Sequence, residues 1–382
     1  MLLNRVFDEI DSSYEKYLNV WADVCRIESP TNCKEGVDEC GRYFAEYARE
    51  LGFIVEYHRE NISGDVLAIT MNPNAKGKPI VFSAHLDTVH PLGSLEENPV
   101  RIEDDKIYGP GVNDCKGGAV GAIMAMDALS KCSYKDRPIL LILQSDEEIS
   151  SITSEKRTID FMAKKSHGCE VFLNCEPYAD RKIVIERKGI IRFVFDITGM
   201  AYHSSKCYDA ANAIAEAAYK IIELEKWKDP DGITCNCGVI NGGTTPNTVA
   251  ENCVFYADIR YKTANELEAV KARVQEIADT VYVKGTSCKL SIKSSRVALE
   301  KTDESLKMAQ RICEICKDSG LGERVPGHAL GGADSADMSA RGILALDSFG
   351  VKGGYSHTSK EYAFTESLRE SAKIMAAVAI KL

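Results

Sequence analysis

The segment Pro79-Ile-Val-Phe-Ser-Ala-His85-Leu-Asp87 is the key to the fold. Its first six residues lack polar alternation, as expected of a strand buried on both faces. Similar apolar runs occur at residues 138–144 and 169–173, and helical patterns lie between the runs, near 117–130 and 154–165. Strands of this kind, joined by helices, are typical of a mostly parallel sheet with helices on both faces. The sequence therefore predicts an α/β fold.

The pattern changes after Ile185. Residues 189–199 alternate apolar and polar side chains, as in a half-buried strand. The expected elements that follow are a helix at 209–226, strands at 233–240 and 252–261, a helix at 265–280 and a strand at 287–293. This β-α-β-β-α-β order is typical of a ferredoxin-like α+β domain. A helix at 303–318, a strand at 342–348 and a helix at 365–381 then resume the first pattern. We expect a catalytic domain in two parts, 1–186 and 297–382, interrupted by an inserted domain at 187–296.

Composition and charge restrict the class of protein. The chain has 382 residues, 45% of them hydrophobic and 27% charged, which is typical of a globular protein with more than one domain. The formal net charge of -10 argues against nucleic acid or an anionic membrane as the main partner. The apolar runs are too short to span a bilayer, and the start of the chain does not resemble a signal peptide.

The fourteen cysteines lie within strand and helix patterns, as buried free thiols do. Cys235-Asn-Cys237 and Cys313-Glu-Ile-Cys316 have no matching second pair, so these pairs alone do not predict a structural zinc site. We expect a soluble protein of the reducing cytoplasm.

Five potential metal ligands occur where predicted strands end or a helix begins. They are His85, Asp114, one member of the pair Glu147-Glu148, Glu176 and His357. Open α/β sheets bind ligands at the carboxyl ends of their strands, so these side chains are expected to meet at one edge. Any one of them alone is more often structural than functional. His58, His90, His167 and His328 lie outside this arrangement and are expected to be structural.

This ligand set predicts a two-metal site. Two imidazoles and three carboxylates suit zinc first, with cobalt or manganese as alternatives. Such a pair of ions polarises a carbonyl group and generates hydroxide from a bridging water. One member of Glu147-Glu148 can ligate while the other acts as general base. Asp87, two residues after His85, can accept the second N–H of the imidazole.

The motifs resemble those of the dizinc family that includes glutamate carboxypeptidase, tripeptide aminopeptidase, succinyl-diaminopimelate desuccinylase and aminoacylase. The matching segments are Phe82 to Val89, Gly109 to Gly118, Ser145 to Glu148, Cys175-Glu176-Pro177, and Gly331-Gly332-Ala-Asp334 running on to His357. The inserted-domain organisation also agrees, so the resemblance covers nearly the whole chain.

The resemblance implies a role for each residue of the site. One metal would be held by His85, Asp114 and Glu176, and the second by Asp114, Glu148 and His357, with Asp114 as the bridge and Glu147 as the general base. The family often has a cis peptide bond after the bridging aspartate. Cys115 stands where methionine is common, and we expect the same geometry because Lys116-Gly-Gly118 follows.

In such enzymes the small domain usually pairs two subunits. His203 matches the histidine that stabilises the oxyanion in the partner's active site. Asn247 and Arg260 match residues that hold the substrate, and Gly332 lies in a matching segment that we also expect to bind substrate. Ser205 to Asp209 replaces the Gly and Pro that often follow the histidine, so the substrate pocket differs from the family pattern. Because the small domain of such enzymes pairs two subunits, a homodimer formed through the inserted domain is expected.

Three functions remain open. The first is an exopeptidase of the carboxypeptidase type acting on small peptides, and the second is a deacylase of N-acyl amino acids. The third is an inactive relative that only binds metal or peptide. Glu147 beside the ligands argues against the third, because loss of the general base would be the simplest route to inactivity.

Overall fold

The computed structural model describes residues 2–382, which form two compact units. The first unit contains the described residues up to Ile185 together with Lys301–Ala329 and Ala333–Leu382. The second contains Glu186–Glu300 and Leu330–Gly332. The catalytic role of the first unit and the role of the second in pairing two subunits stay predictions.

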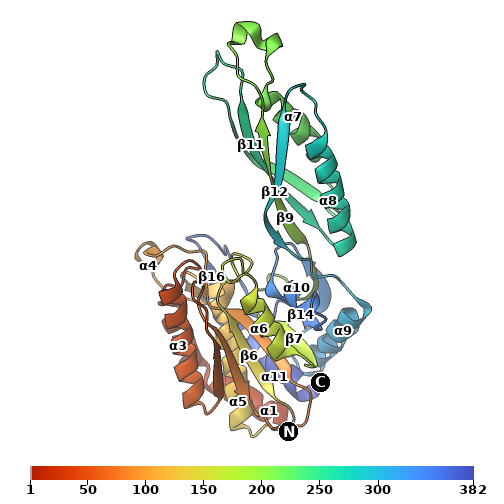
Figure 1. Ribbon diagram of the computed structural model, residues 1–382. Helices are drawn as coiled ribbons and strands as arrows, with labels where there is room; N and C mark the ends of the chain where they lie inside the picture. The colour runs from red at the N-terminus through yellow and green to blue at the C-terminus, as the bar shows by residue number, and fades with distance from the viewer. Residues whose placement is uncertain (1) are drawn as a thin grey trace. The chain divides into compact units, whose positions relative to one another are not determined.

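The first unit is built on a six-stranded sheet (Figure 1). Its strand order is β1 (Ile54–His58), β2 (Val66–Met71), β6 (Ile139–Gln144), β3 (Ile80–His85), β7 (Val171–Asn174) and β14 (Ala345–Leu346). The strands β6, β3, β7 and β14 are parallel to one another, whereas β1 and β2 form an antiparallel edge. The predicted mostly parallel sheet is confirmed. The strand expected at 342–348 is reduced to two residues.

Helices cover both faces of this sheet, as the continuous apolar strands predict. Alternate residues of each strand face opposite sides. Phe82 and Leu141 belong to the larger core, together with residues of α1 (Leu2–Ser12), α2 (Tyr14–Cys25), α3 (Lys34–Glu50), α5 (Gly117–Lys131), α9 (Asp303–Asp318) and α11 (Glu366–Lys381). Val81 and Ile142 belong to a smaller core with α6 (Arg157–Ser166) and α10 (Asp334–Ser339).

Helix α5 starts close to the functional edge of the sheet. A Cβ at Gly118 would lie 2.1 Å from the carbonyl oxygen of Cys175, so only glycine permits this approach. The first turn of α5 is thereby held against the segment that follows β7. This contact places the loop before α5 beside the carboxyl ends of the parallel strands.

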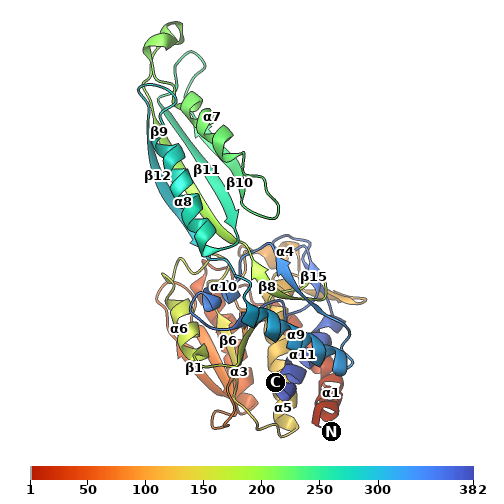
Figure 2. The ribbon, with the colours of Figure 1, turned by 90° about the vertical axis from the view of Figure 1, so that its right-hand side faces the viewer.

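The second unit has the chain order β9 (Gly189–Thr198), α7 (Ala213–Leu224), β10 (Thr234–Gly242), β11 (Asn252–Tyr261), α8 (Ala264–Asp279) and β12 (Ser287–Arg296). Its antiparallel sheet has the order β10-β11-β9-β12, which is the ferredoxin-like arrangement. Figure 2 shows both helices on one face of that sheet. Phe195 and Phe255 stack within its core, with ring centroids 4.4 Å apart.

Helix α7 starts later than the sequence pattern suggests. Residues Ser204–Asp209 form a 3-10 turn, and the Asn212 side chain accepts hydrogen bonds from the backbone N–H groups of Ile214 and Ala215. An asparagine that caps two N–H groups marks a helix start. The predicted start at residue 209 is therefore wrong by one turn.

Several short elements were not expected from the sequence. A second sheet joins β15 (Gly353–Gly354), β16 (Tyr362–Phe364), β5 (Lys106–Tyr108) and β4 (Arg101–Glu103), and β13 (Val325–Ala329) pairs with β8 (Lys182–Arg187). The short helix α4 spans Ser94–Glu97, and a π-type turn spans Val112–Lys116. The strands β4, β5, β15 and β16 have only two or three residues, too few to show a period. No helix within residues 2–382 is long and apolar enough to cross a membrane.

Candidate metal centre

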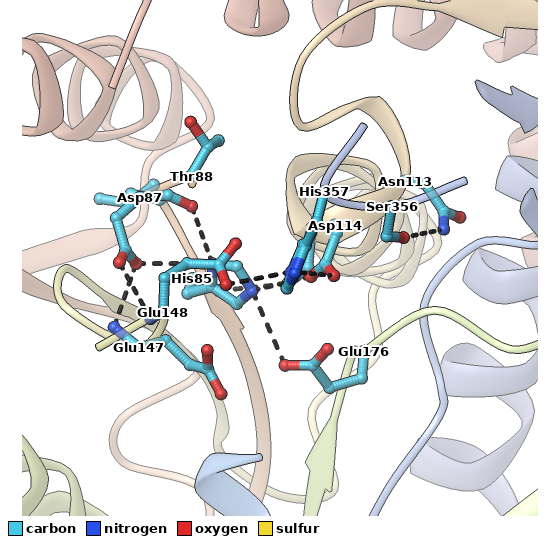
Figure 3. Close-up of polar contacts among 12 residues, drawn as sticks. His85, Asp87, Thr88, Asn113, Asp114, Glu147, Glu148, Glu176, Ser356 and His357 are labelled. Carbon is cyan, nitrogen blue, oxygen red and sulfur yellow. Dashed lines mark hydrogen bonds and ion pairs between the residues drawn. The ribbon is translucent and has the colours of Figure 1, made fainter. Parts of the chain in front are cut away.

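Three neighbouring parallel strands deliver acidic and imidazole side chains to one edge of the sheet. His85 is the last residue of β3, Glu147 and Glu148 follow β6, and Glu176 follows β7. Since β6, β3 and β7 run parallel, their carboxyl ends meet. Asp114 comes from the turn before α5, and His357 from the loop after β15. Figure 3 shows these side chains gathered in one place.

Asp114 lies between the two imidazoles. Its Oδ1 is 3.1 Å from Nε2 of His85, and its Oδ2 is 3.3 Å from Nε2 of His357. Nε2 of His85 is also 3.7 Å from Glu176 Oε1, and Nε2 of His357 is 3.2 Å from Glu148 Oε2. The structure thus brings all five predicted ligands together, as two groups that share Asp114.

The donor set fits two divalent cations. The side chains of His85, Glu148, Glu176 and Asp114 are only 2%, 6%, 11% and 14% exposed, respectively. Buried carboxylates are costly unless positive charge compensates them. Nitrogen and oxygen donors in this ratio suit zinc and similar borderline metals. Each group around Asp114 supplies one imidazole and one further carboxylate, as a two-metal site requires.

The pKa values of these groups reflect crowded negative charge. Burial raises the pKa of Glu148 to about 7, although its hydrogen bond with His357 opposes the shift. Burial, together with the charges of Asp114 and Glu147, holds the pKa of Glu176 well above its usual range. Hydrogen bonds to Asp114 and then Glu148 raise the pKa of His357 to about 11. In the metal-free protein, protons therefore balance the charge that cations would otherwise balance.

Asp87 contacts both the acidic pair Glu147-Glu148 and His85. Its carboxylate accepts the backbone N–H of Glu147 at 3.2 Å and that of Glu148 at 3.1 Å. The Thr31 hydroxyl donates to the same carboxylate at 2.7 Å. Nδ1 of His85 lies 2.9 Å from the Asp87 carbonyl oxygen and 3.4 Å from its carboxylate. Contact with His85 is therefore closest through the main chain, and the carboxylate orders the turn that holds Glu147.

Glu361 supports the turn that carries Asp114, and nothing in the sequence pattern pointed to it. It is 1% exposed, and its Oε1 accepts the backbone N–H groups of Asn113 and Asp114 at 2.9 and 3.0 Å. Its Oε2 lies 2.7 Å from Nε2 of His90, a histidine that the sequence suggested was only structural. The peptide bond between Asp114 and Cys115 is cis, as the family resemblance led us to expect.

The remaining predicted residues, His203, Asn247, Arg260 and Gly332, lie in the second unit. Nδ1 of His203 is 2.8 Å from the Ser205 hydroxyl, and the carbonyl oxygen of Asn247 accepts the Ser204 N–H at 2.9 Å. His203 and Asn247 therefore lie in adjacent loops. Nε of Arg260 donates to Asp258 at 2.7 Å.

The strand register places Arg260 far from His203 and Asn247. Arg260 pairs with Ile190 at the start of β9, whereas Asn252 pairs with Thr198 at its end. His203 forms a bridge with Thr248, just before Asn252. Eight strand positions span about 26 Å at ~3.3 Å per residue. Arg260 and His203 of one chain thus lie toward opposite ends of the small sheet.

Comparison with known proteins agrees with this geometry. A model of the peptidase family M20/M25/M40 matches residues 81–381. Carboxypeptidase G2 from Pseudomonas sp. (strain RS-16) is 25% identical, over 94% of this chain and 87% of that protein. A succinyl-diaminopimelate desuccinylase from Nitrosospira multiformis is 26% identical, over 66% of this chain and 69% of that protein. The crystal structure of an aminopeptidase from Bacillus cereus has a TM-score of 0.80 at 19% identity, covering 96% of this chain and 97% of the other.

Proposed function

The chain belongs to the peptidase family M20/M25/M40, and from this premise we propose that it removes the C-terminal residue of small peptides. It is a metal-dependent hydrolase of amide bonds, in keeping with its family. The observation that carries the proposal is the arrangement around Asp114, whose two oxygens face His85 and His357, with Glu147 on the adjoining turn.

In the proposed site each side chain has one task. His85, Asp114 and Glu176 hold one cation, and Asp114, Glu148 and His357 hold the other. Zinc is the first choice for both, with cobalt and manganese as alternatives. When bound, the two ions supply Lewis acidity toward the scissile carbonyl and activate water for attack.

Glu147 is the proposed general base. Its neighbour Glu148 contacts His357, so the two residues of the pair are divided between ligation and proton transfer. Asp87 accepts both of their backbone N–H groups, which keeps Glu147 in place when Glu148 is bound to a cation. Glu147 would take the proton of the attacking water and deliver it to the leaving amine.

One observation favours a carboxypeptidase over a deacylase, and a second fits both activities. The relative named carboxypeptidase G2 aligns with nearly the whole chain. Arg260 offers a guanidinium group, which can bind a terminal carboxylate through two hydrogen bonds. The second candidate is a deacylase of N-acyl amino acids, favoured by the similarity to succinyl-diaminopimelate desuccinylase. Both substrates keep a free carboxylate beside the scissile amide.

We further propose a homodimer formed through the second unit. β10 is an outer strand of the small sheet, with Val239 and Ile240 exposed, and Ile214, Tyr219 and Ile222 are exposed on α7. An outer strand with apolar neighbours suits pairing with a second copy of the same surface. The distance between His203 and Arg260 along the sheet supports a role for His203 and Asn247 in the partner's site.

A cytoplasmic location is proposed because all fourteen cysteines are free thiols. Such a number of unpaired thiols is usual in a reducing compartment. Fractionation of cells, with detection of the native protein, tests this location.

The substrate proposal is tested with matched peptides. Dipeptides with a free C-terminus, the same dipeptides amidated at the C-terminus, and N-acyl amino acids are compared with added zinc, cobalt or manganese. We expect the free dipeptides to be cleaved, the amidated ones to be poor substrates, and a chelator to abolish cleavage. Full activity of a metal-free preparation would overturn the proposal, and preference for N-acyl amino acids would establish the second candidate.

Arginine variants sharpen this test. Arg192 and Arg260 both donate to Asp258, each through Nε at 2.7 Å, so they form a matched pair. Arg260→Ala should raise KM for the free dipeptides, whereas Arg192→Ala should leave KM near that of the parent. Equal effects of the two variants would remove Arg260 from the substrate site.

A further inference from the structure

We propose that Glu225, Cys235 and Cys237 form a separate binding site, in the second unit, for a thiophilic divalent cation such as zinc. Ligand atoms of the three side chains all lie within 4.8 Å of one another. Three such groups occur within residues 2–382, and the other two share His85 of the metal centre. This site does not depend on the proposed hydrolase function.

The local strand geometry brings the two sulfur atoms to one side. Side chains two positions apart in a strand face the same way, so Cys235 and Cys237 point together. Asn236 pairs with Asp258 and Val239 with Tyr256, so an extra residue is inserted between these pairs. The Cys237 N–H donates to Glu225 in the segment after α7, and the Cys235 N–H donates to Trp227 of the same segment.

Glu225 contacts β10 at the bulge. It follows the last residue of α7, and its Oε1 accepts the Cys237 N–H at 2.6 Å. The same segment returns along β10, because the Cys235 N–H donates to the Trp227 carbonyl oxygen at 2.9 Å. The carboxylate is thus held beside both thiols by main-chain contacts of two elements. A sequence pattern of paired cysteines does not contain this third ligand.

The charge around the three residues suits a divalent cation. Binding would form two sulfur–metal bonds and one oxygen–metal bond, and the two thiol protons would leave to solvent. Two thiolates and a carboxylate carry one more negative charge than the cation neutralises. Lys228 supplies the balancing charge, since its ammonium lies 2.5 Å from Glu225 Oε2 and 2.7 Å from the Cys235 carbonyl oxygen.

The three proposed ligands are buried to different extents. Cys235 is 2% exposed, whereas Cys237 and Glu225 are half-buried. One side of the cluster therefore faces solvent, where water can complete a tetrahedral set. Sulfur donors favour zinc, cadmium and cobalt over magnesium and calcium. The bound ion would tie the end of α7 to β10 at the bulge.

The test uses cobalt as the probe on the full-length, reduced protein. Thiolate ligation gives an intense near-ultraviolet charge-transfer band, which nitrogen and oxygen ligands do not give. We expect the parent to show this band and to bind one equivalent of cobalt more than Cys235→Ser or Cys237→Ser. Cys253→Ser is the matched control, because Cys253 is a buried cysteine of the same sheet outside the cluster.

Cys115→Ser separates this site from the metal centre, because the Cys115 thiol belongs to the group with His85 and Glu176. The band should persist in Cys115→Ser and in Cys253→Ser. Absence of the band in the parent, or its loss only in Cys115→Ser, would overturn the proposal.

Two further measurements do not depend on whether the cysteine variants fold. Glu225→Gln keeps an acceptor for the Cys237 N–H and should weaken cobalt binding without changing the fold. In the parent, zinc should protect half-buried Cys237, but not exposed Cys207, from alkylation, as measured by mass spectrometry. Equal alkylation of Cys237 with and without zinc would contradict the site.

Discussion

Glu361 holds Asp114 in place through a hydrogen bond from the Asp114 backbone N–H to Glu361 Oε1 at 3.0 Å. The same oxygen accepts the N–H of Asn113, and the other oxygen contacts His90. Two hydrogen bonds therefore connect the turn of Asp114, the proposed bridging carboxylate, to a residue almost 250 positions later in the sequence. Its orientation depends on a residue that is not itself a proposed ligand.

Replacement of Glu361 should weaken metal binding. Glu361→Ala leaves two buried N–H groups without their acceptor, which costs about 1–3 kcal/mol for each unsatisfied group. We expect metal affinity to fall by roughly 10- to 100-fold, as for other residues that orient ligands. Metal titration and urea unfolding measure the two effects. Glu361→Gln, which keeps an acceptor, should show smaller losses, and unchanged affinity in Glu361→Ala would refute the role.

Glu147→Gln should reduce kcat by at least ~100- to 10,000-fold, the usual contribution of a general base. Its metal content should stay at the parental level, because Glu147 is not assigned to either ion. Glu148→Gln is the matched comparison and should lose one ion. Rapid-quench kinetics and elemental analysis report the two quantities. If Glu147→Gln lost the metal and Glu148→Gln kept it, the two roles would be reversed.

Asp114→Ala should deplete both ions, because one carboxylate faces both imidazoles. Glu176→Ala and His357→Ala should each weaken only one of the two ions. Elemental analysis after dialysis, for all three variants, provides the comparison. One ion retained at full affinity in Asp114→Ala would show that this carboxylate does not bridge.

His203→Ala should lower the rate by ~100- to 1000-fold without loss of metal, as expected of a group that stabilises an oxyanion. Mixing inactive His203→Ala with inactive Glu147→Gln, under conditions of subunit exchange, should restore activity to at most about half of the parental level per hybrid dimer. One site of the hybrid then has an intact base and a histidine from the partner. Exchange proven by mass spectrometry without recovery of activity would confine His203 to its own chain or exclude it.

The metal-free protein should become less stable as pH rises. The pKa of Glu148 is raised from 4.5 to about 7, mainly by burial, and that of His357 from 6.5 to about 11, mainly by Asp114. A raised pKa means that the native state binds more protons than the unfolded chain between the two values. Glu148 therefore loses stabilising protonation as pH rises from 4.5 to about 7, and His357 as pH rises from 6.5 to about 11.

Thermal unfolding with a chelator and with zinc, over this pH range, measures the effect. The melting temperature of the metal-free protein should fall with pH, and zinc should flatten the slope, because the cations replace the protons. Glu148→Gln should also reduce the slope. If the melting temperature of the metal-free protein rose with pH more steeply than that of the zinc-loaded protein, the predicted direction of the pH effect would be wrong.

Much of the fold follows from local pattern. The runs that became β3, β6 and β7 lack polar alternation, and this pattern suffices to predict a sheet covered on both faces. Once those strands are parallel, their carboxyl ends lie at one edge. The side chains of His85, Glu147, Glu148 and Glu176 must then approach that edge, since each lies at the end of a strand or a few residues after it. The sequence alone therefore determined the edge and most of its donors.

The supporting contacts were decided only by tertiary structure. Glu361 contacts Asp114, and Glu225 contacts Cys237, through side chain to backbone hydrogen bonds that leave no period in the sequence. Asp87 was expected to serve His85, yet its carboxylate also accepts two N–H groups from the turn of Glu147. Hydrophobic periodicity reports which face of an element is buried, because burial repeats along a strand or helix. A single hydrogen bond between distant segments depends on how the finished elements pack, and packing is a property of the whole fold.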